Sequence, residues 1–277
     1  MRIDAHQHFW HYREREFPWI GPGMDALRKD YLPAQLERLM RSAGFEGSIA
    51  VQARQMPEET TWLLELADTH PFIKGVVGWV DLRCADLQRQ LERYAGKRAL
   101  RGVRHVIHDE PDDCFMLRED FLNGISQLAA FGLLYELLLF ARHLPVACRL
   151  VERFPGQQFV LDHIGKPPIK KGLLEPWATD IRKLAALPNV SCKISGMVTE
   201  ADWSAWRQTD LTPYLDVVFE AFGVRRLMVG SDWPVCTVAA PYDRVMKVVT
   251  DFPGRFSQED REMILGGNAH RIYGLRQ

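Results

Sequence analysis

Residues 227–234 read Leu227-Met228-Val229-Gly230-Ser231-Asp232-Trp233-Pro234, an apolar run that ends in a carboxylate and a rigid turn. The same order, an apolar run followed by His or Asp, occurs in Ile3-Asp4-Ala5-His6-Gln7-His8 and in Val160-Leu161-Asp162-His163-Ile164-Gly165. The carboxyl ends of parallel strands in a barrel form one ring, so three segments that are remote in sequence meet at one pocket. The sequence therefore predicts an enzyme active site at that ring.

Apolar runs of strand length alternate with helical patterns along the whole chain. They are rich in Val, Ile and Leu and are often continuous, as in parallel strands that are buried on both faces. The expected strands are Ile3–His8, Gly47–Ala53, Gly75–Val80, Gly102–Ile107, Leu133–Leu139, Gln158–His163, Val190–Ser195 and Arg226–Asp232. Eight βα units in series predict one α/β domain over residues 1–277, a (β/α)8 TIM barrel. The alternative is a doubly wound open sheet, but no glycine-rich phosphate loop follows any of the runs.

Helix signals lie between these strands. Apolar residues at helical spacing predict helices over 36–43, 87–95 and 122–129, which end at Gly44, Gly96 and Gly132. Thr212-Pro213 has the pattern of a cap followed by the first helical position, which predicts a helix from there to about Phe222.

Composition excludes several classes of protein. The formal net charge is −1 and no basic block is present, so nothing indicates a nucleic-acid partner. The N-terminus lacks the apolar core of a secretory signal, and no run is long enough to cross a membrane. The five cysteines are scattered without a CxxC pair and are expected to be reduced thiols of a cytoplasmic protein. The expected partner is a small molecule, and the sequence allows a homo-oligomer.

His6 and His8 are two residues apart at the end of an expected strand. Side chains alternate between the faces of a strand, so both imidazoles can reach one metal or one substrate oxygen. Asp4 has the same parity and is expected to support the pair by accepting a hydrogen bond.

The other two motifs carry the remaining candidates. His163 can serve the site or act as a structural hydrogen-bonding group, while Asp162, of opposite parity, is expected to face the helices or pair within the loop. Asp232 can bind a metal, act as a general base on water, or cap a turn. Trp233 is expected to wall the site.

These motifs resemble the amidohydrolase superfamily, and more narrowly its branch of sugar-lactone and pyrone-lactone hydrolases. The resemblance rests on the segments 4–10, 161–167 and 230–234 and on the closing segment 267–275, and it covers the whole chain. It implies a (β/α)8 barrel. By motif matching, it implies that the site histidines are His6, His8 and His163 and that Asp232 is the catalytic aspartate.

One departure from that family bears on the metal. Many metal-dependent members carry another His on the strand that here reads Val190-Ser191-Cys192-Lys193-Ile194-Ser195-Gly196. Glu136 is the one candidate for a bridging carboxylate. We therefore expect either a single Zn²⁺ on His6, His8, His163 and Asp232, or a metal-free site.

Residues at other strand ends and in the first long loop are candidates for substrate contacts. The set is Trp10, Gln52, Arg54, Arg104, His105, Lys166 and Trp233. An Arg binds a carboxylate or polarises a carbonyl, but Arg54 and Arg104 can equally pair with loop acids. Trp10 can stack on a sugar ring or close a loop over the core.

The expected activity is hydrolysis of a sugar-acid lactone such as L-fuconolactone or L-rhamnonolactone, with Asp232 as the general base on water. His163, His105, Arg104 or a metal would stabilise the oxyanion. Other enzyme functions are a pyrone dicarboxylate or muconolactone-type lactonase and, further off, a metal-dependent decarboxylase. A barrel that binds a sugar acid without catalysis is the alternative from another class.

Overall fold

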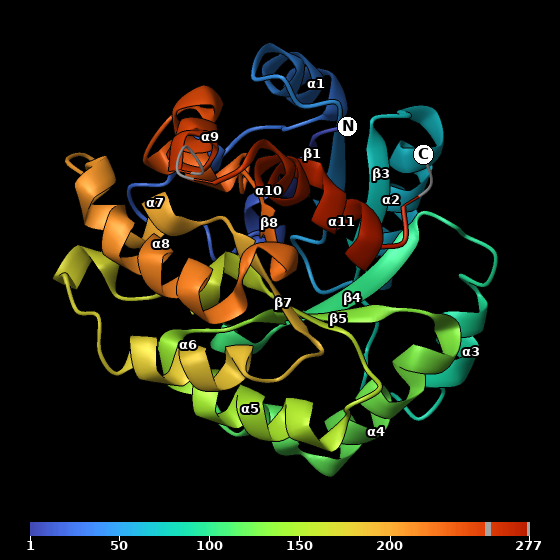
Figure 1. The fold of residues 1–277 in the computed structure, drawn as a ribbon. Coiled ribbons are helices and arrows are strands. Elements are labelled where there is room, and N and C mark those ends of the chain that lie inside the picture. The colour runs from blue at the N-terminus through green and yellow to red at the C-terminus, as the bar shows by residue number, and fades with distance from the viewer. Residues whose placement is uncertain (253–255, 276–277) are drawn as a thin grey trace.

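In the computed structural model, which describes residues 1–252 and 256–275, eight strands lie side by side in the order of the sequence (Figure 1). Each pairs in parallel with the next. They are β1 (Ile3–Gln7), β2 (Gly47–Val51), β3 (Ile73–Gly78), β4 (Leu100–Val106), β5 (Leu134–Leu138), β6 (Phe159–Leu161), β7 (Val190–Ile194) and β8 (Leu227–Val229). All eight expected strands are present, but several are shorter than predicted because the chain turns at the site residues.

The helices surround these strands (Figure 1). They are α1 (Pro33–Ser42), α2 (Pro57–Thr69), α3 (Leu87–Glu92), α4 (Glu119–Leu128), α5 (Leu144–Arg153), α6 (Trp177–Ala185), α7 (Met197–Glu200), α8 (Gln208–Phe222), α9 (Tyr242–Asp251), α10 (Gln258–Glu262) and α11 (Asn268–Ile272), with a π-helical turn at Met263–Gly267. Among the described residues, no helix is long and apolar enough to cross a bilayer. All five cysteines are free thiols.

The segments at the ends of the first and last strands meet and close the barrel. The backbone N–H of His8 donates to the carbonyl of Trp233 over 2.7 Å, and the N–H of Asp232 donates to the carbonyl of His6 over 2.8 Å. This closure, with a helix outside each strand, is that of a (β/α)8 TIM barrel and confirms the predicted fold.

A second, smaller core fills the barrel itself. Ile3, Ala5, Val77, Val160 and Met228 are among its buried members, and apolar residues of α11 pack against it. The barrel interior is therefore packed at the end where the strands begin, and the active sites of such barrels lie at the other end, where the strands end.

The predicted start of α8 is wrong. The helix begins at Gln208, four residues before Thr212, and Pro213 lies inside it. The backbone N–H of Arg207 donates to the Asp210 side chain over 2.8 Å, so Asp210 caps the helix at its true start.

Candidate active site

A pocket of about 310 Å³ opens at the carboxyl ends of the strands. Its volume lies at the small end of the range for small-molecule sites, roughly 300–1,000 Å³. Its lining consists of His8, Trp19, Met24, Ala53, Arg104, Val106, His108, Asp109, Leu138, Phe140, His163, Lys166, Thr199, Glu200, Trp203, Asp232 and Val235. Three of the four predicted catalytic residues are thus in its wall, and His6 lies directly behind them.

Strand β1 brings His6 and His8 to the pocket, but it does not alternate regularly between its two faces as its sequence predicts. The pairing of β1 with β2 shifts register between Asp4 and Gln7. Such an irregularity interrupts the alternation of faces. Asp4 therefore accepts hydrogen bonds from Ser231 and from the hydroxyl of Tyr242 in the helix layer, not from either imidazole. The expectation that Asp4 supports the histidine rings is wrong.

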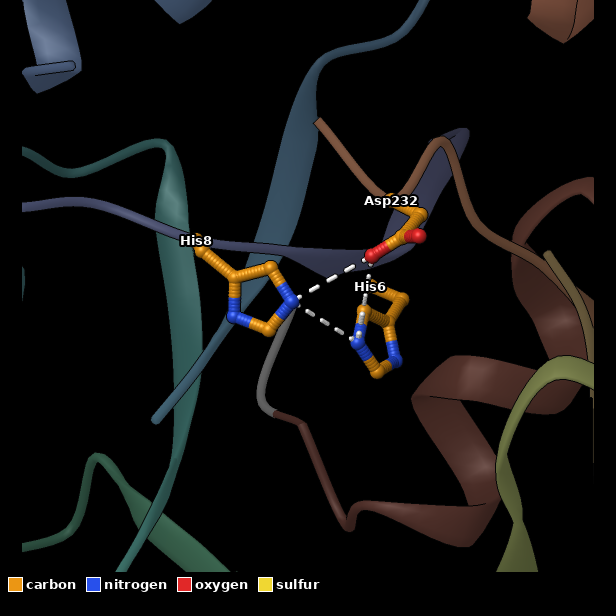
Figure 2. A group of neighbouring side chains, drawn as sticks. All are labelled: His6, His8 and Asp232. Carbon is orange, nitrogen blue, oxygen red and sulfur yellow. Dashed lines mark hydrogen bonds and ion pairs between the residues drawn. The ribbon is translucent and has the colours of Figure 1, made fainter. Parts of the chain in front are cut away.

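His6, His8 and Asp232 form a compact cluster (Figure 2). Nε2 of His6 lies 3.2 Å from Nε2 of His8, which lies 3.3 Å from Oδ1 of Asp232. Nδ1 of His8 is 2.8 Å from the carbonyl of Val51, which can only accept, so His8 carries its proton on Nδ1. Its Nε2 therefore presents a lone pair to the cluster.

His163 reaches the same cluster from a strained turn after β6. Its φ is 54°, in the left-handed region that non-glycine residues rarely adopt. Nδ1 of His163 lies 2.9 Å from the hydroxyl of Ser195, and Nε2 lies 3.9 Å from Oδ1 of Asp232. Every non-glycine residue with positive φ in the described ranges belongs to this region: His163, Ile164, Lys166 and Asp232. Strain of this kind concentrates at functional sites.

The turn at His163 also overturns the expectation for Asp162. Val160 faces the barrel core, and Asp162, two residues on, continues inward. Its Oδ1 lies 3.3 Å from Nδ1 of His6, and its Oδ2 accepts from Arg104 over 2.9 Å. Asp162 thus orients His6 and Arg104 from inside the barrel, instead of facing the helices.

Two glycines make room for the histidines. A Cβ on Gly230 would lie 2.6 Å from Cβ of His6, and one on Gly196 would lie 2.5 Å from Nδ1 of His163. Real Cβ atoms do not approach other atoms so closely. The glycine of the Gly-Ser-Asp motif is therefore required for the close approach of β8 to His6.

The protonation states favour a base among neutral imidazoles. Burial lowers the pKa of His163 to about 3, and burial together with Lys193 holds the pKa of His6 well below its usual value. Burial raises the pKa of Asp232, but interactions with His163, His8 and Lys166 lower it, and the net shift is downward. At neutral pH the site therefore presents an ionised Asp232 beside the uncharged imidazoles of His6 and His163.

These donors fit a divalent metal. His6, His8 and Asp232 form one group of potential ligands, and His6, Asp162 and His163 form another. Tetrahedral ligands about 2.0–2.1 Å from zinc lie roughly 3.3 Å from one another. The separations of 3.2 Å between the two Nε2 atoms and 3.3 Å from Nε2 of His8 to the carboxylate are close to that spacing, and Nε2 of His6 lies 3.9 Å from the same carboxylate oxygen. The hydrogen bonds to Nδ1 provide the outer support that metal-binding histidines need.

A buried charge network lies beneath the cluster. Nζ of Lys193, on the strand that lacks a histidine, lies 2.6 Å from Glu136, 3.2 Å from Asp162 and 3.1 Å from Nδ1 of His6. The hydroxyl of Tyr273 donates to the other oxygen of Glu136 over 2.5 Å. Burial and Asp162 raise the pKa of Glu136, and Lys193 opposes them. The carboxylate considered as a metal bridge is thus engaged by a lysine.

Two predicted aromatic contacts lie behind the pocket wall. Trp10 is fully buried, and its Nε1 donates to the carbonyl of Lys29 over 3.0 Å, so it closes the long first loop over the core. Trp233 is also buried and packs edge-on against Tyr31. The aromatic side chains that line the pocket are instead Trp19, Phe140 and Trp203.

Arg54, Gln52 and His105 are not in the lining either. Arg54 pairs with Glu16 and with Glu59, 2.5 Å away, and Gln52 binds the guanidinium of Arg104 from behind. His105 follows Arg104 on β4 and points outward, where it stacks on Phe115. His105 therefore has no part in the proposed chemistry.

Three of the lining residues missed by sequence reasoning lie past the end of β7. Thr199, Glu200 and Trp203 line the pocket from α7 and the turn that follows it. A helix of four residues is too short for a periodic apolar pattern. The available signal was position alone, since these residues follow the expected strand Val190–Ser195.

Comparison with known proteins agrees with this arrangement. Residues 3–275 match the family described as amidohydrolase. The chain belongs to the amidohydrolase family. It is 45 % identical over 286 residues to an L-fucono-1,5-lactonase of Burkholderia multivorans, covering 99 % of this chain and 96 % of that protein. A second L-fucono-1,5-lactonase, of Burkholderia ambifaria, is 36 % identical over 282 residues, with the same two coverages.

A crystal structure of a relative adds the metal. An amidohydrolase of Burkholderia multivorans with bound zinc matches this amidohydrolase with a TM-score of 0.96 and 45 % identity, over the full length of both chains. The histidine and aspartate groups described above fit a divalent metal in this chain as well.

Proposed function

We propose that this amidohydrolase opens the lactone ring of a neutral sugar acid, with L-fuconolactone as the first substrate to test and one Zn²⁺ as the metal. The names of the two lactonase relatives support the reaction, and the zinc-bound relative supports the metal. The pocket is small enough to suit one sugar ring.

The observation that carries this proposal is the charge of the pocket wall. Its two permanent cations are each already paired, Arg104 with Asp162 over 2.9 Å and Lys166 with Glu200 over 3.1 Å. A pyrone dicarboxylate would need free cations for its carboxylates. Paired cations and hydroxyl-binding groups favour an uncharged lactone instead.

Asp232 is the proposed general base. Its Oδ1 faces the imidazoles, and its Oδ2 takes a proton from the attacking water. The water oxygen bonds to the lactone carbonyl carbon, and Asp232 then returns the proton to the ring oxygen as the carbon–oxygen bond breaks. The product hydroxy acid ionises and releases a proton to solvent.

Arg104 and His163 complete the proposed machinery. Arg104 lies in the pocket wall with its N–H groups engaged by Gln52 and Asp162, so it would stabilise the developing oxyanion by its charge, while His163 and His8 orient the water and the carbonyl. The ligand set for the metal is His6, His8, Asp232 and His163. When bound there, a divalent ion would polarise the carbonyl and acidify water.

The test is acid release, followed with a pH indicator, from aldonolactones and one pyrone dicarboxylate lactone. We expect turnover of neutral lactones that falls after chelation and returns with Zn²⁺. Full activity in metal-depleted protein, verified by elemental analysis, would overturn the metal assignment. Absence of acid release from every lactone would overturn the function, and a parallel assay for CO₂ release from unsaturated acids would then test the decarboxylase.

The base is tested by Asp232→Asn. We expect kcat to fall by about 10²–10⁴-fold with the fold retained. Asp68→Asn is the matched control, because Asp68 is 63 % exposed on the outer face of α2. Full turnover by Asp232→Asn would show that another group acts as the base.

A further inference from the structure

Lys166 and Glu200 form an ion pair in the wall of the pocket. Nζ of Lys166 lies 3.1 Å from Oε1 of Glu200, and the two side chains are 18 % and 21 % exposed. Lys166 belongs to the left-handed turn that carries His163, and its backbone N–H donates to the carbonyl of His163 over 2.9 Å. The pair is therefore held at a fixed place beside the catalytic groups.

The pocket wall is acidic overall. It contains two cations, Arg104 and Lys166, and three carboxylates, Asp109, Glu200 and Asp232. Lys166 is the only one of the two cations whose partner also lies in the wall, since Asp162 binds Arg104 from inside the barrel. Glu200 thus decides whether the wall holds a cation that is free to bind an anion.

We propose that Glu200 is a specificity-determining residue: by pairing with Lys166 it prevents the pocket from retaining carboxylates, so that neutral lactones bind and the anionic hydroxy acid leaves. This inference rests on the proposed function. Hydrolysis converts an uncharged ring into a carboxylate at the same place, and a free lysine there would bind the product more tightly than the substrate.

Glu200 is better placed for this role than the other carboxylate at the rim. Asp109 is 59 % exposed and accepts from Nδ1 of the neighbouring His108 over 2.8 Å. Glu200 is less exposed and is the direct partner of Lys166. Loss of a charge at Glu200 therefore frees the lysine, whereas loss of one at Asp109 frees a histidine.

The experiment compares Glu200→Gln with Glu220→Gln. Glu220 also pairs with a cation, Arg182, at 3.0 Å, but lies 68 % exposed on the outer helix α8. Binding of the aldonate that corresponds to the hydrolysed lactone is measured by calorimetry and as product inhibition. We expect Glu200→Gln to bind aldonate about fivefold more tightly, the effect of one partly exposed ion pair. Glu220→Gln should match the wild type.

Two further readouts separate charge from a structural effect. The gain in aldonate affinity should shrink in about 0.5 M salt, and the double variant Lys166→Met/Glu200→Gln should lose it. Hydrolysis of a lactone that bears a carboxylate, such as D-glucaro-1,4-lactone, should rise several-fold in Glu200→Gln relative to that of a neutral lactone. If Glu200→Gln does not fold, Glu200→Asp, which withdraws the carboxylate by one carbon, should show a smaller gain of the same sign.

The outcomes distinguish this inference from the proposed function. Wild-type hydrolysis of neutral lactones together with unchanged aldonate affinity in folded Glu200→Gln would overturn the role of Glu200 alone. A gain in affinity that persists in the double variant would also overturn it. Absence of lactone hydrolysis by the wild type would overturn the proposed function and this inference with it.

Discussion

Gly196 lies directly against the ring of His163, and no side chain fits between them. A Cβ at position 196 would lie 2.5 Å from Nδ1 and 2.6 Å from Cγ of that ring. Gly196 also has a φ of +60°, so its backbone independently favours glycine. The ring also contacts the hydroxyl of Ser195, and another part of it borders the pocket. Its position therefore depends on the absence of a side chain at Gly196.

Gly196→Ala should therefore displace His163. We expect kcat/KM to fall roughly 10- to 100-fold, because small misplacements of catalytic groups are costly, with a loss of stability. Gly172→Ala is the control: Gly172 also has positive φ, +64°, but a Cβ there would meet nothing within 4 Å. Both variants should lose about 1 kcal/mol of unfolding free energy to backbone strain, and only Gly196→Ala should lose activity. Equal activities would show that the ring can move without consequence.

The buried histidine should make stability fall in acid. The pKa of His163 is about 3 in the folded protein and 6.5 ordinarily, so between these values the unfolded chain binds the extra proton. The stabilisation is complete above about pH 6.5 and is lost as pH falls toward 3, by roughly 5 kcal/mol at most. Urea unfolding at a series of pH values should show a shallower slope for His163→Gln than for the wild type. Above about pH 7, where neither the folded nor the unfolded chain binds the extra proton at His163, the two slopes should coincide, and equal slopes below pH 6.5 would contradict the prediction.

Substitutions in the buried charge network beneath the site should have non-additive effects on the free energy of unfolding. Lys193→Met leaves the buried carboxylates of Glu136 and Asp162 without their common cation. We expect a loss of about 3–5 kcal/mol in unfolding free energy. Adding Glu136→Gln should recover part of that loss, giving a coupling of about 0.5–3 kcal/mol in a double-mutant cycle. Additive effects of the two substitutions would mean that the 2.6 Å contact between them contributes nothing.

Arg54 should matter for stability and not for substrate affinity. It pairs with Glu59, which is 1 % exposed, and it is absent from the pocket lining. Arg54→Ala should lower the unfolding free energy by about 2 kcal/mol because a buried carboxylate loses its partner. KM for the best lactone should stay within about twofold. A large rise in KM would return Arg54 to the substrate-binding set, where its place at a strand end first suggested it.

A structural feature could be predicted from the sequence where it follows from a local pattern. The eight strands could be predicted because continuous apolar runs are the direct signature of parallel strands, and the ring of His6, His8, His163 and Asp232 follows from where those runs end. The choice between Arg104 and His105 was also within reach, since adjacent residues on β4 face opposite ways. Only one of the two could enter the pocket.

The remaining features depend on three-dimensional context. The register shift in β1 and the left-handed turn at His163 break the alternation on which the expectations for Asp4 and Asp162 rested. Lys193 and Glu136 form an ion pair inside the barrel, and no local sequence pattern predicts that these two residues are partners. Pairings of this kind arise from how strands tilt and close, which a local pattern does not encode.

The closure of the barrel makes the site depend on the last of the eight strands. The two backbone bonds that join the first strand to the last involve His6, His8, Asp232 and Trp233. A nascent chain that has reached α8 holds the histidines of β1 but neither the carboxylate nor the edge that pairs with them. In the proposed mechanism, turnover therefore begins only when the segment that follows the last strand has docked on the first strand, so the appearance of lactone hydrolysis would report the final step of folding.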